Sequence, residues 1–274
     1  MEAALNHTKY RLKPGAKLDL GQKDPADKSA LPGGSKENAV QLLAQWSKEI
    51  DRLQDLLFAQ QKHAVLVVLQ GMDSSGKDGV VRHVFSEVDP LGVRAVGFKA
   101  PTPVELAHDF LWRVHREVPG KGEIVVFNRS HYEDVLVVRV HKWISAEICT
   151  ERYRQINEFE RTLAENGTLV LKFFLHISKD EQKKRLQERV DDPDKRWKFN
   201  PRDLEERKLW SDYMGAYEDA LSATSTQWAP WCIVPADSKT NRNIVISSVL
   251  KDALAGLNMS YPQPEWDPAT IRVT

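Results

Sequence analysis

The segment at residues 65–80, VLVVLQGMDSSGKDGV, constrains the fold of this chain more than any other part of it. Its first half is a run of apolar and β-branched residues, which is typical of a buried strand. The run leads into a turn that contains Gly71 and Gly76 and ends at Lys77. Gly-x-x-x-x-Gly-Lys between a strand and a helix is typical of a phosphate-binding (Walker A) loop, whose backbone N–H groups surround anionic oxygens. The alternative is a chance match, because Asp-Ser-Ser-Gly is also favourable turn chemistry, but the flanking strand and helix patterns argue against it.

Two carboxylates distinguish this loop from the common Walker A sequence. Asp78 takes the position after the lysine, where a Ser or Thr hydroxyl normally binds Mg²⁺. Asp73 lies inside the loop, where a negative charge beside phosphates is costly unless a cation lies between them. We expect Asp73 to hold Mg²⁺ or to orient the attacking phosphate oxygen, and Lys77 to bind phosphate. The other loop residues that we expect to contact phosphate are Gly71, Met72, Ser74, Ser75, Gly76 and Asp78.

The composition argues against some classes of function. The 274 residues, 41% of them hydrophobic, suit one large α/β domain with a substantial core. The formal net charge is zero, so an anion site must come from local clustering, and binding to nucleic acid is not favoured. No run approaches the ~18 apolar residues that a membrane helix needs, so we expect a cytoplasmic protein without a membrane partner.

The pattern of apolar residues divides the chain into an N-terminal arm at 1–35, a main domain at 36–258 and a C-terminal tail at 259–274. Strands are expected at 64–70, 94–98, 124–128, 169–177 and 231–235, and helices directly after the loop and at 37–62, 104–116, 132–140, 146–165, 179–189, 204–221 and 241–257. This alternation predicts a three-layer α/β sandwich, a parallel five-stranded sheet with helices on both faces. Together with the phosphate-binding loop and the helical lid described below, we expect a P-loop kinase fold. Gln70, Asn128 and Ile177 end three of the strands and should open toward the same cleft.

A second candidate site is the sequence FNRSHYED at residues 127–134, which follows a buried strand. Arg129 can bind a phosphate oxygen through two parallel hydrogen bonds, and Glu133 lies about one helical turn away on the same face. The alternative is a helix start with Ser130 as N-cap and Glu133 as the capping-box acid, which leaves Arg129 unexplained. We expect catalytic roles for Arg129 and Glu133, and the expected nucleotide contacts are Asn128, Ser130 and Tyr132.

A third candidate site is the segment at residues 185–208, in which basic and acidic residues alternate. Pro193 and Pro201 interrupt its helical pattern, which favours a lid between two helices. The alternative is a solvated charged surface. Trp197 and Phe199 lie among the cations and argue against that alternative, because an exposed tip does not favour aromatic residues unless it closes on something.

At these three sites the chain resembles the polyphosphate kinase 2 family, over residues 46–257 approximately. The resemblance rests on the loop GMDSSGKDG, the block FNRSHYEDVLVVRV, the lid DDPDKRWKFNPRDLEERKLW and the following SDYMGAYEDAL. It implies a thymidylate-kinase-like fold and phosphoryl transfer between inorganic polyphosphate and nucleotides with Mg²⁺ or Mn²⁺. It also implies that Asp73 serves metal and catalysis, that Lys77 binds phosphate and that Arg129 contacts the transferring phosphates. The implied polyphosphate contacts in the lid are Arg189, Lys195, Lys198, Arg207 and Lys208.

The chain departs from the family at one block. Many members read Asp-Arg-Ser-Trp-Tyr-Asn, whereas residues 128–133 read Asn-Arg-Ser-His-Tyr-Glu. The carboxylate is missing at Asn128 and present at Glu133, so Glu133 is the expected second metal ligand beside Asp73. This variant resembles the class III subgroup, which accepts both AMP and ADP.

The resulting hypothesis is an enzyme that transfers phosphoryl groups from polyphosphate to AMP or ADP and gives ADP or ATP. One alternative is an ATP-dependent nucleoside monophosphate kinase, for which Ser or Thr is expected in place of Asp78. Another is a non-catalytic P-loop module that binds nucleotide. The amphipathic helices and the tryptophan content also permit a homo-oligomeric interface.

Overall fold

The structure is a computed structural model, and it describes residues 7–273. Within them the chain forms a five-stranded parallel sheet in the order β2-β3-β1-β4-β5. The strands are β1 (Ala64–Gln70), β2 (Val93–Gly97), β3 (Ile124–Asn128), β4 (Thr168–His176) and β5 (Trp231–Pro235). The predicted fold class is confirmed, and the strands at 64–70, 124–128 and 231–235 have the predicted bounds.

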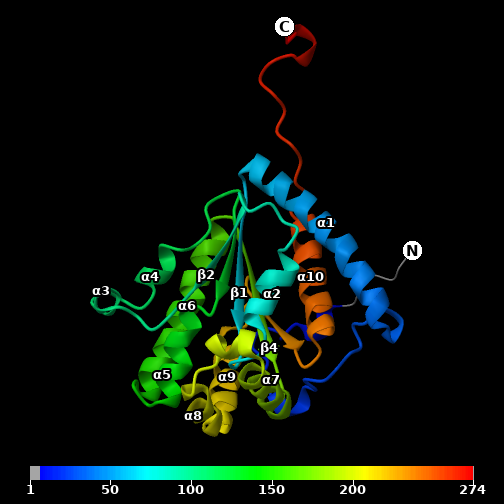
Figure 1. The fold of residues 1–274 in the computed structure, drawn as a ribbon. Helices are drawn as coiled ribbons and strands as arrows, with labels where there is room; N and C mark the ends of the chain where they lie inside the picture. The colour runs from blue at the N-terminus through cyan, green and yellow to red at the C-terminus, as the bar shows by residue number, and fades with distance from the viewer. Residues whose placement is uncertain (1–6, 274) are drawn as a thin grey trace.

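Helices cover both faces of this sheet (Figure 1). They are α1 (Lys36–Gln60), α2 (Lys77–Val84), α3 (Pro103–Leu106), α4 (Trp112–His115), α5 (Val137–Val140), α6 (Ala146–Glu165), α7 (Lys179–Asp191), α8 (Arg202–Lys208), α9 (Trp210–Thr224) and α10 (Lys239–Ala255). Figure 1 shows α1, α2 and α10 on one side of the sheet and α5 and α6 on the other. The helices α7, α8 and α9 lie together near the carboxyl ends of the strands.

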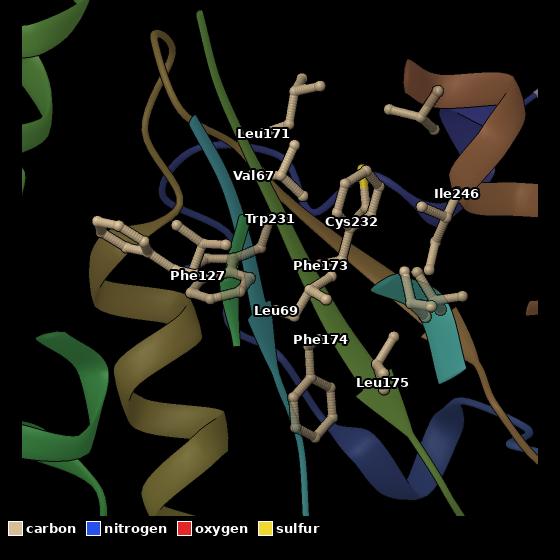
Figure 2. Close-up of a cluster of buried hydrophobic side chains, with 14 of the residues drawn as sticks. Val67, Leu69, Phe127, Leu171, Phe173, Phe174, Leu175, Trp231, Cys232 and Ile246 are labelled. Carbon is tan, nitrogen blue, oxygen red and sulfur yellow. The ribbon is translucent and has the colours of Figure 1, made fainter. Parts of the chain in front are cut away.

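The core lies along the central strands. Every residue of β1 and β5 is buried, as is typical of parallel strands that are covered on both faces. Figure 2 shows Val67, Phe173 and Ile246, from β1, β4 and α10, in one cluster of buried side chains. The register pairs Leu69 with Asn128 and Gln70 with Phe174, so these strands end at the same edge of the sheet.

The described part of the N-terminal arm lies against the body of the protein. Leu18 and Leu20 are buried, and the backbone N–H of Leu12 donates to the carbonyl of Trp231 at 2.7 Å. Arg11 forms an antiparallel bridge with Cys232 at the edge of β5. The arm therefore covers the outer strand of the sheet.

Three predicted helices are each divided in the structure. The one at 104–116 becomes α3 and α4, because the carboxylate of Asp109 accepts the N–H of Leu111 at 3.0 Å and competes with helical hydrogen bonds. The one at 132–140 becomes a 3₁₀ helix at His131–Val135 followed by α5, with Leu136 (φ −107°) between them. The one at 204–221 becomes α8 and α9, which are separated at Leu209.

Candidate active site

The loop at residues 71–76 joins β1 to α2 and depends on its two glycines. Gly71 and Gly76 have φ of +147° and +106°, values that L side chains rarely adopt. A Cβ at Gly76 would lie 1.9 Å from Nη1 of Arg242, and one at Gly71 would lie 2.8 Å from the carbonyl oxygen of Leu175. Only glycine therefore allows the loop to curl this closely against α10 and β4.

Lys77 lies inside this curl. Its side chain is buried, and its Nζ donates to the carbonyl oxygens of Gly71 at 2.7 Å and Met72 at 3.2 Å. An ammonium group has three donors, so one remains after these two bonds. Burial lowers the pKa of Lys77, and the carboxylate of Asp73 opposes this shift. A bound anion would complete the hydrogen bonding of this buried cation.

Three side chains hold the loop from outside through its carbonyl oxygens. Arg185 of α7 is the centre of this clamp. Its Nη1 donates to the carbonyls of Ser74 and Ser75 at 3.0 and 3.1 Å, and its Nη2 donates to those of Ala236 and Asp237 at 2.7 and 2.8 Å. The carbonyls of Ser74 and Ser75 thus point toward α7 and not into the curl.

The other two members of the clamp are Gln182 of α7 and Arg242 of α10. Gln182 donates from Nε2 to the carbonyl of Asp73 at 3.0 Å, and Arg242 donates from Nη1 to that of Ser75 at 3.4 Å. Burial and the neighbouring Arg185 lower the pKa of Arg242 to about 10. The sequence analysis did not identify Gln182 or Arg242, because neither lies in a motif.

Arg129 connects the loop with the strand-end block. Its Nη2 lies 2.9 Å from Oδ1 of Asp73, and its Nη1 lies 4.0 Å from Oε2 of Glu133. Arg129 has a positive φ of 65°, which is unusual for a non-glycine residue and typical of functional sites. The structure therefore brings together the four predicted catalytic side chains, Asp73, Lys77, Arg129 and Glu133.

The charges of this cluster shift one another's pKa values. Burial alone would lower the pKa of Arg129, but the carboxylates of Glu133 and Asp73 outweigh it and raise the pKa. Burial raises the pKa of Glu133 above its ordinary value, although Arg129 and Lys77 oppose the shift. The cluster combines two cations with two carboxylates in a partly desolvated site, which is where perturbed pKa values mark functional residues.

Asn128 and Asp78 form a second contact between the strand-end block and the loop. Nδ2 of Asn128 donates to Oδ1 of Asp78 at 2.7 Å. Asp78 takes the position of the usual hydroxyl residue after Lys77, and Asn128 takes a position where many members of the family that this chain resembles have Asp. The hydrogen bond joins these two residues.

Two predicted nucleotide contacts need correction. Ser130 and Tyr132 are fully buried. Oγ of Ser130 accepts from Nε2 of Gln70 at 3.1 Å and from the N–H of Tyr132 at 3.2 Å. The hydroxyl of Tyr132 donates to Glu160 at 2.8 Å. These side chains face the protein interior in this structure, where they position the block. Ser130 does act as an N-cap, but the carboxylate of Glu133 points to Arg129 and not back to the cap.

A buried ionic network lies beneath this block. Oε2 of Glu160 accepts from Nζ of Lys172 at 2.6 Å, and both side chains have no exposed surface. Nζ of Lys172 also donates to the hydroxyl of Tyr132 at 2.9 Å, and Nε2 of His131 lies 3.2 Å from Oε1 of Glu160. The sequence analysis did not find this network, because its members come from different elements: α6, β4 and the block itself. It fixes the segment that carries Arg129 and Glu133.

The lid consists of the end of α7, the 3₁₀ helix Pro193–Lys198 and α8. Two of its predicted phosphate-binding cations pair with acids three positions away in the chain, Lys195 with Asp192 and Lys208 with Glu205. Arg189 of α7 lies 3.8 Å from the carboxylate of Asp203 of α8. Arg207 instead contacts α7. Nζ of Lys198 lies 4.9 Å from the ring centroid of Trp197, whose side chain is 78% exposed. The aromatic tip is thus open to solvent in this structure.

A cavity of about 310 Å³ lies beyond the end of β2, next to the strand-end block. The residues that line it include Phe98, Lys99, Thr102 and Arg113. Arg113 donates to the carbonyl of Lys99 at 2.8 Å and lies 3.4 Å from the carboxylate of Asp134. The cavity lies at the end of β2, whose last residue, Gly97, pairs with Asn128 at the end of β3.

Divalent-cation chemistry is compatible with the side chains of this site. Oγ of Ser74 and Ser75 and Oε1 of Gln70 are buried without a hydrogen-bond partner, and the carboxylates of Asp73 and Glu133 lie in the same cluster. Among residues 7–273 there is no cluster of three or more His, Cys, Asp or Glu side chains that forms a metal site by itself. Mg²⁺ typically takes one or two protein carboxylates and completes its shell with substrate phosphates and water.

Within residues 7–273, no helix is long and apolar enough to cross a membrane.

Comparisons with known proteins agree with this geometry. The AMP/ADP-polyphosphate phosphotransferase of Meiothermus ruber is 55% identical over 257 residues, which cover 94% of this chain and 96% of that protein. The ADP-polyphosphate phosphotransferase of Rhodopseudomonas palustris is 46% identical over 270 residues, which cover 93% and 91% of the two chains. The crystal structure of Polyphosphate Kinase 2 from Arthrobacter aurescens matches with a TM-score of 0.93 at 44% identity, covering 98% of this chain and 96% of that one.

The sequence model of one family, Polyphosphate kinase 2, matches residues 33–262. This range contains the loop, the strand-end block and the lid, the sites on which the resemblance rests. The chain belongs to the polyphosphate kinase 2 family.

Proposed function

We propose that this protein transfers a terminal phosphoryl group of inorganic polyphosphate to AMP or ADP and so forms ADP or ATP. The single observation that carries the proposal is the cluster in which a buried lysine inside the phosphate-binding loop lies beside Arg129 and the carboxylates of Asp73 and Glu133. The names of the two relatives support the same reaction, one with AMP and ADP and one with ADP.

Positioning and charge neutralisation supply the catalysis. The acceptor phosphate oxygen is already anionic, so no protein nucleophile is needed. Lys77 and the N–H groups of the loop hold the polyphosphate end, and Arg129 stabilises the charge that develops on the transferring group. Arg129 has to release Asp73 or share it when phosphate binds, since its guanidinium pairs with that carboxylate in the structure.

Asp73 and Glu133 are the proposed ligands of Mg²⁺ or Mn²⁺. When bound, the ion neutralises charge on the phosphate oxygens. The two carboxylates keep their places through Arg129, which lies between them, and Glu133 stands in for the acid that this chain lacks at Asn128.

The cavity beyond β2 is the proposed acceptor site. Its volume of about 310 Å³ lies in the range of small-molecule pockets, and Arg113 and Lys99 offer cationic groups at its wall. Asn128 stays a proposed nucleotide contact, because its amide lies at the same edge of the sheet. The polyphosphate chain would run past the lid cations Arg189, Lys195, Lys198, Arg207 and Lys208.

A nucleoside monophosphate kinase that uses ATP is the second candidate, because it shares the loop. Asp78 disfavours it, since this carboxylate occupies the hydroxyl position and bonds to Asn128. A module that binds nucleotide without catalysis does not explain why Arg129 is held in a strained conformation between two carboxylates. The expected cytoplasmic location and homo-oligomeric interface stay predictions.

The decisive assay supplies Mg²⁺, polyphosphate and either AMP or ADP, without ATP, and follows the nucleotides by chromatography. We expect ADP from AMP and ATP from ADP. A parallel reaction contains ATP and AMP without polyphosphate. Turnover only in that parallel reaction would identify an ATP-dependent kinase. No turnover in either reaction would favour the module that binds nucleotide without catalysis.

A further inference from the structure

Gln182 connects two regions that are far apart in the sequence. It lies on α7 with only 1% of its surface exposed. Its Nε2 donates to the backbone carbonyl of Asp73 in the loop at 3.0 Å. Its Oε1 accepts from Nη1 of Arg207 on α8 of the lid at 2.8 Å. One buried amide therefore touches the loop with one end and the lid with the other.

The chemistry of the partners fixes the orientation of this amide. Arg207 can only donate, so it requires Oε1 of Gln182, and a carbonyl can only accept, so Asp73 requires Nε2. Nη1 of Arg207 is further held by the carbonyl of Lys179 at 2.6 Å. When Arg207 is docked on α7, the amide has one satisfied arrangement, and it is the one that holds Asp73.

The carbonyl of Asp73 is a sensitive point of the loop. Its own carboxylate pairs with Arg129 at 2.9 Å, and the next residue, Ser74, has a positive φ of 64°. A non-glycine residue in this conformation persists only where the surroundings hold it. The bond from Gln182 to the carbonyl therefore helps to set where the Asp73 carboxylate points.

We propose that Gln182 is a positioning residue that couples the docking of the lid to the geometry of the loop. With Arg207 on α7, the amide is aligned and Asp73 is held toward Arg129. With Arg207 released, Oε1 of Gln182 loses its partner in a buried environment, the amide can turn, and the loop loosens. The coupling is a property of the protein without ligand, while its effect on catalysis rests on the proposed function.

Hydrogen exchange of the protein without ligand tests the coupling. Arg207→Met removes the lid side of the connection and touches no loop atom. We expect the amide of Ser75, which donates to the carbonyl of Met72 within the loop at 3.0 Å, to exchange roughly three- to tenfold faster in this variant, as the loss of about one hydrogen bond implies. Gln182→Met, which is close in size, should give the same increase. The double variant should equal either single one, because both break the same connection.

Matched controls lie on the same helices. Arg202→Met changes an exposed arginine of α8, and Gln187→Met changes an exposed glutamine of α7. Both should leave loop exchange at the wild-type rate. The coupling is overturned if Arg207→Met leaves exchange of the Ser75 amide unchanged, if Arg202→Met accelerates it equally, or if the two single effects add in the double variant.

Gln182→Glu separates the two ends of the connection. A carboxylate still accepts from Arg207 but cannot donate to the carbonyl of Asp73 when ionised. We expect fast loop exchange with wild-type exchange in residues 202–208. Slow exchange in the loop would contradict the proposal.

Activity adds a readout that distinguishes the two proposals. For transfer from polyphosphate to AMP, Gln182→Met and Arg207→Met should each lower kcat roughly three- to tenfold, with the KM for AMP unchanged. A wild-type protein that transfers nothing would refute the proposed function, whereas the exchange experiment would still decide the coupling. Wild-type kcat in Gln182→Met would refute the catalytic effect of the coupling.

Discussion

The loop at 71–77 and the lid carry the expected phosphate contacts, but the loop and the exposed lysines of the lid are held in opposite ways. Side chains from α7 and α10, more than 100 positions away, bind the loop carbonyls. In the lid, Lys195 and Lys208 pair with acids three positions away, and Trp197 is 78% exposed. Distant buried contacts preorganise a site, whereas local exposed ones contribute little stability and yield easily.

This difference suits the two halves of the proposed substrate. The reacting phosphate needs fixed geometry, since small displacements in an active site are costly. The rest of a polyphosphate chain is a flexible polyanion and needs only positive charge nearby. The comparison therefore predicts large effects on kcat from changes in the loop and small effects on KM from changes in the exposed lid lysines. Arg207 differs from those lysines because it docks on α7.

Lys77→Ala should have the largest effect. It removes the buried ammonium inside the loop, and we expect kcat for transfer to AMP to fall by about 10³-fold. The circular dichroism spectrum should stay that of the wild type. Lys184→Ala, an exposed lysine on α7, is the matched control and should retain full activity. If the kcat of Lys77→Ala is within tenfold of the wild-type value, the ammonium group in the loop does not contribute to catalysis as proposed.

Arg185→Met should come second, because it removes the centre of the clamp. The carbonyl oxygens of Ser74, Ala236 and Asp237 lose this donor, and that of Ser75 keeps only the 3.4 Å bond from Arg242. The free energy of unfolding should therefore fall by about 2–4 kcal/mol. The loop loses its alignment as well, so kcat should fall by about 100-fold. Chemical denaturation and initial rates measure the two effects, with Arg154→Met, an exposed arginine of α6, as the control. Loss of stability without loss of kcat would show that the clamp does not set the loop geometry.

The acid side of the pH profile should depend on Glu133. Burial raises its pKa, so this carboxylate takes up a proton at a higher pH than an ordinary glutamate. Below that pKa the charge that pairs with Arg129 is lost, and kcat should fall by about tenfold per pH unit. Glu133→Gln should have low activity and no such acid limb, whereas the exposed control Glu151→Gln should keep it. An unchanged acid limb in Glu133→Gln would assign the titration to another group.

Substitution of an exposed lid lysine that pairs only within the lid should have the smallest effect. Lys195 is exposed, so Lys195→Ala should raise the KM for polyphosphate only about two- to fivefold and leave kcat unchanged. The difference from wild type should shrink at high salt, because screening weakens exposed charges. Lys13→Ala, an exposed lysine of the arm, is the control. A tenfold loss of kcat in Lys195→Ala would contradict the contrast between loop and lid.

The sequence predicts the parts of the molecule that local patterns encode. Apolar runs bounded by turn residues place β1, β3 and β5, and the Gly-x-x-x-x-Gly-Lys spacing places the loop. Arg129 was identified as well, since an arginine directly after a buried strand has no simple structural role. These signals lie within a few residues of one another.

Other features depend on tertiary contacts that no local pattern contains. Gln182 and Arg242 read as ordinary helix residues, and the Glu160–Lys172 pair joins α6 to β4. Tyr132 is a residue for which the local sequence predicts a role that the packing does not support. Its place beside Arg129 and Glu133 predicted a ligand contact, but its ring packs against Trp231 with centroids 4.8 Å apart. Only the packing of distant elements decides which way such a side chain points.

The most direct test of the central claim is a crystal structure of the protein with Mg²⁺ and a short polyphosphate. The terminal phosphate should lie within the curl of residues 71–77 and contact Nζ of Lys77, with the ion between a phosphate oxygen and the carboxylate of Asp73. Polyphosphate bound away from this loop, or an ion that does not touch Asp73, would contradict the claim.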